Sequence, residues 1–412
     1  MQVRKLSAYV LRVSLRKPFR HASAERHYSD NIVVRTELAD GTFGWGEGVP
    51  RDYVTGETAE GALAQLTATP AAEQLADDAS TWQDVLALCD RFQPAAMIDD
   101  PRDCHGNSLR AAVELSLLDA YGKVFAEPVS RAIETFLSAT SLSQEEQPTS
   151  YASSEHSQRT TLLAPRDQVQ YSTTIDAEHG RKLWRSALKM RVYGFAQCKV
   201  KVGADAESDT RRMRVIRRWI GPRVDLRVDA NEAWRAENLV TREEALRPFG
   251  VTCIEQPLPH EDLSALAELR GKIDTPIMLD ESLTSLQDAK EAIRLSACDL
   301  FNIRISKCGG VLNSLRLAAL AHEHGLSYQL GCHPGETGIL SAAGRHLACT
   351  LGGIRYLEGS YDHHVLAQVP TTPDLTFGYG GRAPRLSEPG LGVTLDLDAS
   401  RQAIRGQCEV EF

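Results

Sequence analysis

From about residue 170 to residue 370, short apolar segments alternate with helix-like segments, and a polar residue follows nearly every apolar one. This repeated strand-then-helix pattern predicts a parallel sheet with right-handed crossovers, because each helix returns the chain to the start of the next strand. The polar residues recur at intervals of about 26 residues, which a closed barrel explains better than an open sheet. They are Lys201, Asp229, Glu255, Asp280, Lys307, His333 and Glu358.

The rest of the chain predicts a second unit beside the barrel. Residues 2–15, 31–38 and 42–48 resemble strands, and residues 58–76, 80–92 and 107–123 resemble helices. We therefore expect an α/β fold, a (β/α) barrel of modified TIM type with an N-terminal α+β capping domain that the C-terminal tail completes. The expected segments are 1–137 for the cap, 138–169 for a polar linker, 170–370 for the barrel and 371–412 for the tail.

Bulk properties argue against several classes of partner. The 412 residues have a net charge of −9, which does not favour binding to nucleic acid or to an anionic membrane. No stretch of about 18 apolar residues occurs, so we expect no membrane span. The nine cysteines are scattered without a CxxC pair, which indicates buried thiols in a reducing compartment, and we expect the cytoplasm.

Two lysines interrupt the apolar segment QCKVKVG at positions 199 and 201. On a strand this spacing places both side chains on one face, where two ammonium groups repel and each lowers the pKa of the other. Such a pair needs carboxylates, a metal ion or an anionic substrate close by.

Three carboxylates end three consecutive predicted strands: Asp229 in LRVDAN, Glu255 in CIEQPL and Asp280 in IMLDES. For any one of them the alternative is a helix cap or a pair with an arginine. Three at matching places in successive units favour a metal site, since a buried ionised group needs a partner. Oxygen ligands on neighbouring strand ends suit Mg²⁺, with Mn²⁺ as an alternative.

Lys307 ends the next predicted strand, in FNIRISKCGG. Lys201 and Lys307 are therefore expected on opposite sides of a metal-bound substrate, where one lysine removes a proton from a carbon and the other returns it. Lys199 and the metal ion would stabilise negative charge that develops on substrate oxygens.

This order of motifs resembles the enolase superfamily. Within it, the chain looks like the muconate lactonizing enzyme subgroup, which includes dipeptide epimerases, N-acylamino acid racemases and o-succinylbenzoate synthases. The resemblance extends to AAVELSLLDAYGK at residues 111–123 and PGLG at residues 389–392, and so covers nearly the whole chain. Its most specific residues are Lys199-x-Lys201, Asp229-x-Asn231, Glu255-Gln256-Pro257, Asp280-Glu281-Ser282 and Lys307 with Gly309-Gly310.

The resemblance implies a role for each of these residues. It makes Asp229, Glu255 and Asp280 the Mg²⁺ ligands, supported by Asn231, Glu281 and Glu336. It makes Lys201 and Lys307 the acid and base, with Lys199 assisting the substrate carboxylate. The loops at residues 19–30 and 49–57 become specificity loops of the cap. The candidate substrate contacts are His21, Arg51, Tyr53, Thr55, His333 and Glu358.

The implied activity is that of a Mg²⁺-dependent isomerase that removes a proton α to a carboxylate and passes through an enediolate. A racemase or epimerase fits this residue set, and so do a muconate-type cycloisomerase and a lyase such as o-succinylbenzoate synthase. The expected partner is a small carboxylate, and a homo-oligomer is compatible with the resemblance.

Two differences between this sequence and branches of the superfamily limit which activities the resemblance implies. The mandelate racemase-like branch uses a histidine base after the seventh strand; here Lys307 holds the sixth-strand position, so we interpret His333 as lining the pocket. Dipeptide epimerases have an Asp-x-Asp motif after the eighth strand that holds the substrate amine, whereas residues 358–362 of this chain read EGSYD.

Two hypotheses of other classes remain. A metal-independent barrel enzyme could use Lys307 or Lys201 as a Schiff-base nucleophile, but it leaves the three carboxylates unexplained. A non-catalytic binding module would bury many charged groups that its function does not need, and removing charges from water has a large free-energy cost.

Overall fold

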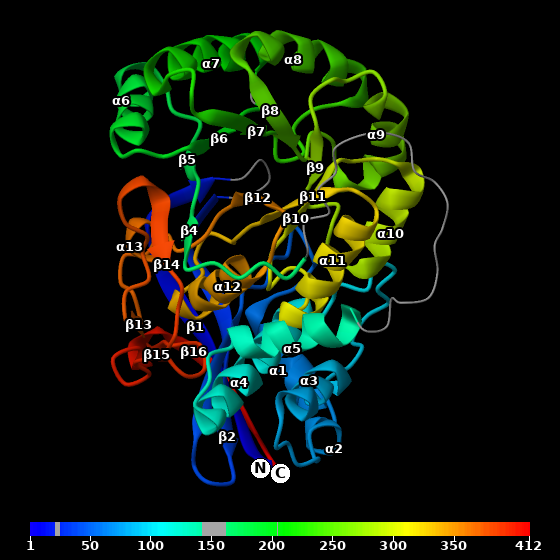
Figure 1. The fold of residues 1–412 in the computed structure, drawn as a ribbon, viewed down its shortest axis with the longest axis vertical. Coiled ribbons are helices and arrows are strands. Elements are labelled where there is room, and N and C mark those ends of the chain that lie inside the picture. Colours follow the sequence, from blue (N-terminus) through cyan, green and yellow to red (C-terminus); the bar gives the residue numbers. More distant parts are fainter. Residues whose placement is uncertain (21–24, 142–161, 204) are drawn as a thin grey trace.

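The computed structural model describes residues 1–20, 25–141, 162–203 and 205–412. The candidate contact His21 and residues 142–161 of the predicted linker lie outside the described residues. In Figure 1 the N-terminal unit, coloured blue to cyan, lies below a green-to-orange unit, and both chain ends meet at the bottom of the view.

An antiparallel sheet of four strands forms the cap, in the order β16–β1–β2–β3. The C-terminal strand pairs with the first one, with Lys5 opposite Glu411, so the tail completes the cap sheet. The first two strands pair almost to their ends, and most of the predicted loop at residues 19–30 is therefore strand. The sequence did not predict these strand residues, because their side chains are polar. Strand pairing needs only backbone hydrogen bonds, so polar side chains do not prevent it. The bounds are β1 Val3–Arg20, β2 Glu25–Leu38, β3 Phe43–Gly48 and β16 Ile404–Glu411.

Five helices follow the third strand of the cap. The sequence predicted one helix across residues 58–76, but Pro70 divides it, because proline has no N–H to continue the helical hydrogen bonds. The last of the five continues four residues into the predicted linker. Their bounds are α1 Ala59–Ala68, α2 Ala71–Gln74, α3 Trp82–Arg91, α4 Asn107–Phe125 and α5 Ser130–Ser141.

Helix α4 lies directly against the cap sheet because β3 has a glycine at every second position. A Cβ atom at Gly44, Gly46 or Gly48 would overlap backbone atoms of α4. Glycine is the residue that permits such a close approach of two backbones. The helix is buried from Leu109 to Tyr121 except at Arg110, and it forms the centre of the cap.

The second unit is a curled sheet of eight parallel strands that follow one another in chain order. A hydrogen bond of 2.8 Å from Ser172 N to Leu357 O connects its first edge to its last. The α/β fold class and the eight predicted strands are confirmed. The strands are β5 Thr173–Ile175, β6 Gln197–Lys201, β7 Asp225–Asp229, β8 Val251–Glu255, β9 Ile277–Leu279, β10 Leu300–Ile303, β11 Ser327–Leu330 and β12 Ile354–Leu357.

Helices on the outside of this sheet alternate with its strands (Figure 1). They are α6 Gly180–Val192, α7 Ala206–Ile220, α8 Leu239–Leu246, α9 Leu263–Arg270, α10 Leu286–Leu295, α11 Val311–Glu323 and α12 Gly338–Thr350. Short elements complete the fold: β4 Gln168–Gln170 pairs with β14 Arg382–Pro384, β13 Thr371–Thr372 pairs with β15 Thr394–Leu395, and α13 is Asp362–Val365. Among the described residues, no helix has both the length and the apolar character needed to cross a membrane.

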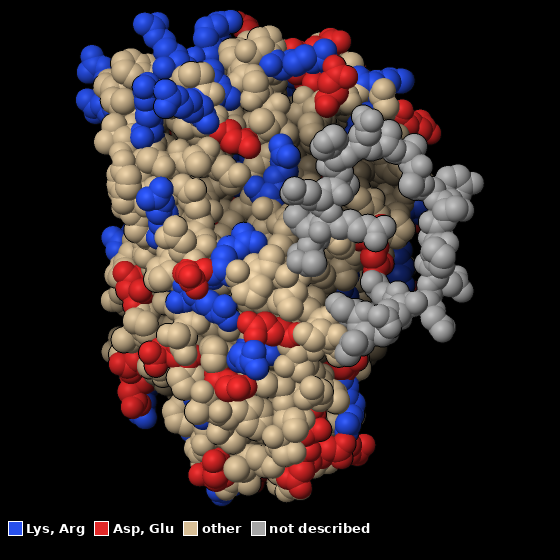
Figure 2. Space-filling view, viewed as in Figure 1, with Lys and Arg blue, Asp and Glu red and all other residues tan. Residues whose placement is uncertain are grey.

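The charge of the surface is unevenly distributed. Figure 2 shows Lys and Arg side chains gathered at the upper left, over α6 and α7. Helix α6 alone contributes Arg181, Lys182, Arg185, Lys189 and Arg191, all exposed. The net charge of −9 therefore does not describe this face of the molecule.

Two buried glutamates of the cap hold the first turns of two barrel helices. Glu114 of α4 accepts hydrogen bonds from the backbone N–H groups of Val311 and Leu312, at 2.5 and 3.1 Å, where α11 begins. Glu47 of β3 accepts them from Thr337 N and Leu340 N, at 3.0 and 3.2 Å, where α12 begins. Burial raises the pKa of each carboxyl to about 7, although these hydrogen bonds act in the opposite direction.

We expect Glu114→Gln to reduce the pH dependence of stability. An acid whose pKa rises from 4.5 to about 7 on folding destabilises the folded state as pH increases through that interval. Glutamine keeps an oxygen acceptor and cannot ionise, so the drop in the free energy of unfolding between pH 5 and pH 8 should shrink by about 2–3 kcal/mol.

Urea unfolding at the two pH values measures this difference. The control Glu60→Gln replaces an exposed glutamate of α1 and should retain the wild-type difference, because Glu114 stays in place. The same drop in Glu114→Gln as in the wild type would contradict the prediction.

Candidate active site

The predicted catalytic side chains are brought together at the carboxyl ends of the barrel strands. In the sheet register Lys201 lies opposite Asp229, and Asp229 lies opposite Glu255. These are the last residues of β6, β7 and β8, so they form one row at the edge where such barrels place their chemistry. Asp280 directly follows β9 and continues the row.

Lys199 is buried among three carboxylates. Its Nζ atom is 3.4 Å from Asp229 Oδ2, 3.3 Å from Glu255 Oε2 and 3.0 Å from Glu358 Oε1. Burial lowers the pKa of Lys199, but the three negative charges outweigh it and raise the pKa well above its usual value. The expectation of a depressed pKa was wrong for Lys199, because carboxylates surround this ammonium more closely than the other cations do.

Lys307 reaches the same site from a turn and not from a strand end. Strand β10 ends at Ile303, and residues 305–309 form a turn before α11, which corrects the predicted strand end. The ammonium of Lys307 nevertheless donates to Asp280 Oδ1 at 2.8 Å, to Asp280 O at 2.6 Å and to Asn302 O at 2.9 Å. All three donors of the ammonium thus have an acceptor.

Asp280 and Glu255 differ strongly in acidity although they end neighbouring strands. Burial raises the pKa of Asp280, but Arg304 and Lys307 outweigh it and bring the pKa to about 2. Burial together with the charge of Asp229 raises the pKa of Glu255 to about 8, and Lys199 offsets this only in part. Glu255 is therefore a carboxylate that lacks sufficient positive charge nearby.

Asn231 and Glu281 lie beside the carboxylates, as the resemblance implied. The backbone N–H of Asn231 donates to Asp229 Oδ1 at 3.0 Å, and its amide donates to Glu281 Oε1 at 3.5 Å. Asn231 has a φ of 42°, in the left-handed region that asparagine tolerates better than most residues. This backbone turn directs the chain from β7 around the Asp229 carboxylate.

Glu358 is engaged by two cations of the protein. Lys199 Nζ donates to its Oε2 at 3.1 Å and lies 3.0 Å from its Oε1, and Arg227 donates to Oε1 at 2.6 Å. Burial raises the pKa of Glu358, but Lys199 and Arg227 outweigh it and hold the pKa at about 2. The structure thus places this predicted substrate contact as the counter-charge of Lys199.

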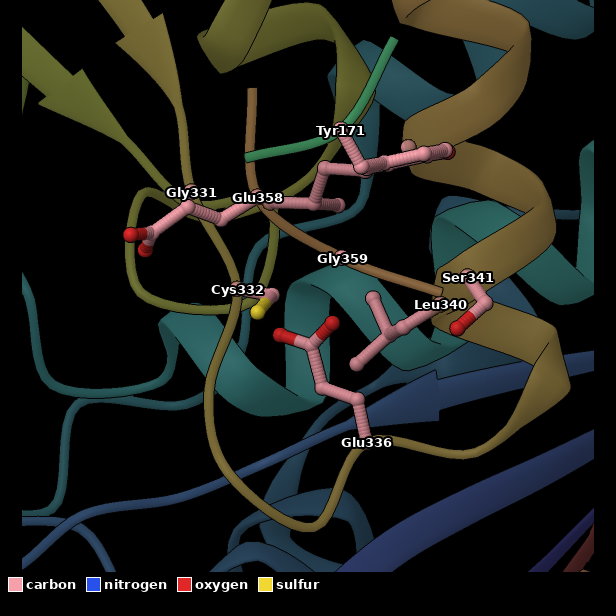
Figure 3. A pocket seen from close by; sticks show the side chains of 10 residues that line it. Tyr171, Gly331, Cys332, Glu336, Leu340, Ser341, Glu358 and Gly359 are labelled. Carbon is pink, nitrogen blue, oxygen red and sulfur yellow. The ribbon is translucent and has the colours of Figure 1, made fainter. Parts of the chain in front are cut away.

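A small cavity opens beside this network, between β11, β12 and α12. Its lining includes Tyr171, Cys332, Glu336, Leu340 and Glu358. In Figure 3 the Glu336 side chain points up toward Cys332, whereas the Glu358 carboxylate points to the left of the view, away from Glu336. Burial raises the pKa of Glu336 to about 8, and its Oε1 accepts from His333 N at 2.6 Å.

The ring of His333 is buried close to the cationic side of the site. Burial, followed by the charges of Arg304 and Arg51, lowers its pKa well below the usual value. Neither ring nitrogen hydrogen-bonds to any residue that the structure describes. A neutral, buried imidazole is compatible with the predicted role of lining the pocket.

The three described candidates of the cap loop at residues 49–57 contact the protein itself. Arg51 is buried and donates to Pro50 O, Ser29 Oγ and Pro334 O, which ties the loop to the segment after β11. Thr55 is buried and donates to Glu57 Oε2 at 2.6 Å. Tyr53 is half-buried, with the Arg26 guanidinium 5.1 Å from its ring. Arg51 and Thr55 therefore hold the loop in place, and Tyr53 remains the more accessible of the three.

Sequence reasoning missed three polar residues of this network: Arg227, Asn302 and Arg304. Arg304 pairs with Asp280, and Asn302 donates to Glu255 Oε1 at 2.8 Å. The sequence contained a signal for these residues. Arg227 is two residues before Asp229, Asn302 is two residues before Arg304, and residues two apart on a strand point to the same face.

Two family models match the chain. Residues 182–399 match the enolase C-terminal domain-like family, and residues 5–133 match the mandelate racemase/muconate lactonizing enzyme N-terminal domain. The chain belongs to the mandelate racemase/muconate lactonizing enzyme family of the enolase superfamily. The first match alone covers more than half of the chain.

Characterised relatives of this family member are racemases and epimerases. N-succinyl-L-Arg/Lys racemase of Bacillus cereus is 27% identical over 409 residues, which are 98% of each chain. Hydrophobic dipeptide epimerase of Enterococcus faecalis is 26% identical over 84% of this chain and 87% of its own. The crystal structure of the Bacillus cereus racemase superposes with a TM-score of 0.82 over the whole of both chains, at 24% identity.

Members of this enolase-superfamily family bind Mg²⁺, and the residues present here fit such an ion. The structure of a dipeptide epimerase from Cytophaga hutchinsonii, with a TM-score of 0.80, contains Mg and a dipeptide. In this chain Glu255 Oε2 is buried, makes no hydrogen bond to the described residues and has only the ion pair with Lys199. An unsatisfied hard oxygen between Asp229 and Asp280 is the donor type that Mg²⁺ prefers.

We expect Asp280→Asn to weaken Mg²⁺ binding by about tenfold or more, because it removes one charged oxygen from the three carboxylates. Isothermal titration of the substrate-free protein with MgCl₂ measures the affinity. The matched control is Asp362→Asn, a buried aspartate that accepts from Ser341 Oγ at 2.9 Å and is expected to leave the affinity unchanged. Equal affinities in Asp280→Asn and the wild type would exclude Asp280 as a ligand.

Proposed function

We propose that this chain is a Mg²⁺-dependent racemase or epimerase that removes the proton α to the carboxylate of an N-acylated amino acid. One observation carries the proposal. Strands β7, β8 and β9 lie side by side and present Asp229, Glu255 and Asp280, and the strands on either side, β6 and β10, lead to Lys201 and Lys307. A substrate whose carboxylate faces a metal ion held by these three residues would have a lysine on each side.

The two lysines supply the proton transfers. One lysine in its neutral form accepts the α-proton from its side of the substrate, and the electron pair of the broken C–H bond moves into the carboxylate as an enediolate. The lysine on the other side, as an ammonium, donates a proton to the same carbon and inverts it. The three acceptors around Lys307 Nζ match the three N–H donors that an ammonium has.

Charge on the substrate oxygens is stabilised by the residues around Lys199. When bound by Asp229, Glu255 and Asp280, Mg²⁺ would supply positive charge at those oxygens. Lys199 adds a fixed ammonium on one side of the row, and Arg304 adds a guanidinium on the other. Lys199 is buried and the side chain of Arg304 is only 12% exposed, so their fields are weakly screened by water.

The end of β12 favours an acylated amine over a free one. A substrate with a free ammonium needs carboxylates that are free to bind it. Here Glu358 is paired with Lys199 and Arg227, and Asp362 accepts from Ser341 of α12. An N-acyl amino acid carries no α-ammonium, and the N-succinyl amino acids on which the Bacillus cereus relative acts are the first candidates. The second candidate is a dipeptide, supported by the similarity to epimerases of this specificity.

Loss of the α-deuteron into water, followed by mass spectrometry, tests the proposal. The substrates are pooled α-deuterated N-succinyl, N-acetyl and dipeptide compounds with Mg²⁺, in both configurations. We expect exchange and inversion of N-succinyl amino acids, and loss of both with EDTA. Exchange of dipeptides alone would favour the second candidate. In a separate incubation with a muconate, formation of a lactone would favour a cycloisomerase. Absence of exchange throughout the pool would reject the proposal.

Single lysine variants should separate the two sides of the reaction. Lys201→Ala and Lys307→Ala are each expected to lower α-exchange of one enantiomer by about 100-fold or more, because each removes one general base. Inversion should fall by a similar factor in both variants, since it needs both lysines. If borohydride with a keto acid covalently labelled Lys201 or Lys307, the Schiff-base hypothesis would replace this one.

A further inference from the structure

The turn that carries Lys307 is held by side chains of the cap. Residues 307–310 read KCGG and connect β10 to α11, and helix α4 of the cap lies beside them. Two residues of α4, Asn107 and Glu114, reach this turn. Glu114 binds its far end, at the first N–H groups of α11, as described above. Asn107 binds its near end.

Asn107 connects two segments of the barrel that are distant in sequence. Its side-chain amide donates to Lys307 O at 2.7 Å and to Thr284 O at 2.8 Å. Thr284 lies four residues after Asp280, in the segment that follows β9. Asn107 is 4% exposed, so water does not compete effectively for these two carbonyl groups. One cap side chain therefore joins the segment of a predicted metal ligand to that of a predicted acid–base lysine.

The two glycines of the turn make room for the cap side chains. A Cβ atom on Gly309 would lie 2.6 Å from Asn107 Oδ1, and one on Gly310 would lie 2.5 Å from Glu114 Oε2. Both glycines have positive φ angles, 82° and 109°, which side chains disfavour. The Gly309-Gly310 motif thus has a physical reason: the turn must pass closely under two polar side chains of α4.

We infer that Asn107 is a positioning residue of the cap that holds Lys307 against Asp280 and so sets proton transfer on one face of the substrate. The inference rests on the proposed two-lysine function. It makes the cap part of the acid–base machinery, through a hydrogen-bonded contact that is remote from the specificity loops. The two N–H groups of the Asn107 amide donate to the Lys307 and Thr284 carbonyls, so this contact acts on the segment of Lys307 and not on strand β6, which carries Lys201.

This asymmetry predicts a kinetic signature. When Lys307 is displaced, the enantiomer whose α-hydrogen faces it should lose exchange, and inversion should slow in both directions. The other enantiomer should still exchange its proton through Lys201. General loss of stability would instead lower both exchange rates by the same factor.

The test compares Asn107→Leu with a matched cap variant, Asn31→Leu. Asn31 is also buried and also donates two hydrogen bonds, to Glu47 Oε1 at 2.6 Å and to Gly335 O at 2.8 Å, but it holds the segment after β11. We expect Asn107→Leu to lower exchange on the Lys307 face by about 10- to 100-fold, with the Lys201 face and KM changing by less than about threefold. Asn31→Leu should leave the ratio of the two exchange rates as in the wild type.

A second measurement needs no substrate and therefore separates this inference from the proposed function. Competitive acetylation of the folded protein, read by mass spectrometry, gives the reactivity of Lys307 relative to Lys201. Asn107→Leu should raise the relative labelling of Lys307 several-fold, because Lys307 leaves its buried contacts with Asp280 and Asn302, and Asn31→Leu should not. If Asn107→Leu does not fold, Asn107→Ser replaces it in both measurements.

The outcomes are distinct. Selective loss on the Lys307 face together with selective labelling of Lys307 supports the inference. Equal loss on both faces, or labelling that is unchanged or rises equally in Asn31→Leu, overturns it. If the wild-type protein exchanges no substrate, the proposed function fails, and the labelling result alone decides the role of Asn107.

Discussion

The structure depends on the burial of opposite charges at one end of the barrel. Lys199 lies within 3.4 Å of carboxylate oxygens from β7, β8 and the end of β12, and Arg304 and Lys307 bind Asp280 from the other side. Removing such charges from water costs several kcal/mol for each ion, and only close pairing offsets it. A chain that retains this network sacrifices stability, as enzymes do at sites built for electrostatic catalysis.

Positive charge is unevenly distributed over this network. The pKa of the Glu255 carboxyl is raised to about 8, whereas Asp280 and Glu358 have pKa values near 2 because protein cations bind them. The carboxylate at the centre of the row is therefore the one with too little positive charge. A divalent cation at this place would satisfy it, which connects the membership of a Mg²⁺-binding family with the electrostatics of this particular chain.

The cap does more than cover the barrel. Glu47 and Glu114 bind the first turns of α12 and α11, and Asn107 binds the turn that carries Lys307. These contacts come from β3 and α4, which pack closely because glycines occupy one face of β3. The position of the cap therefore determines the position of barrel loops that carry polar groups, so cap and barrel act as one unit at the site.

Much of the architecture could be predicted from the sequence. The eight βα repeats recur at a regular period, and seven of the eight predicted strands end near a polar residue. Parallel strands bring such residues to a common edge whatever their exact packing. Residues whose positions the sequence did not predict lie in turns and loops, where the position depends on the exact backbone conformation. Lys307 was assigned to a strand end and lies in the turn at residues 305–309, between β10 and α11. The sequence also did not indicate that Arg51 and Thr55, two candidate substrate contacts, hydrogen-bond to groups of the protein itself.

The sequence by itself determined the order of the carboxylates and lysines along the chain and hence their order around the sheet, because chain order and strand order coincide in a βα barrel. Only the tertiary structure decided which charges meet. That Glu358 neutralises Lys199, that Arg304 binds Asp280 and that Asn107 reaches Lys307 across 200 positions follows from packing between elements distant in sequence. Local patterns carry no information about such contacts, since each partner is equally compatible with its own strand or helix.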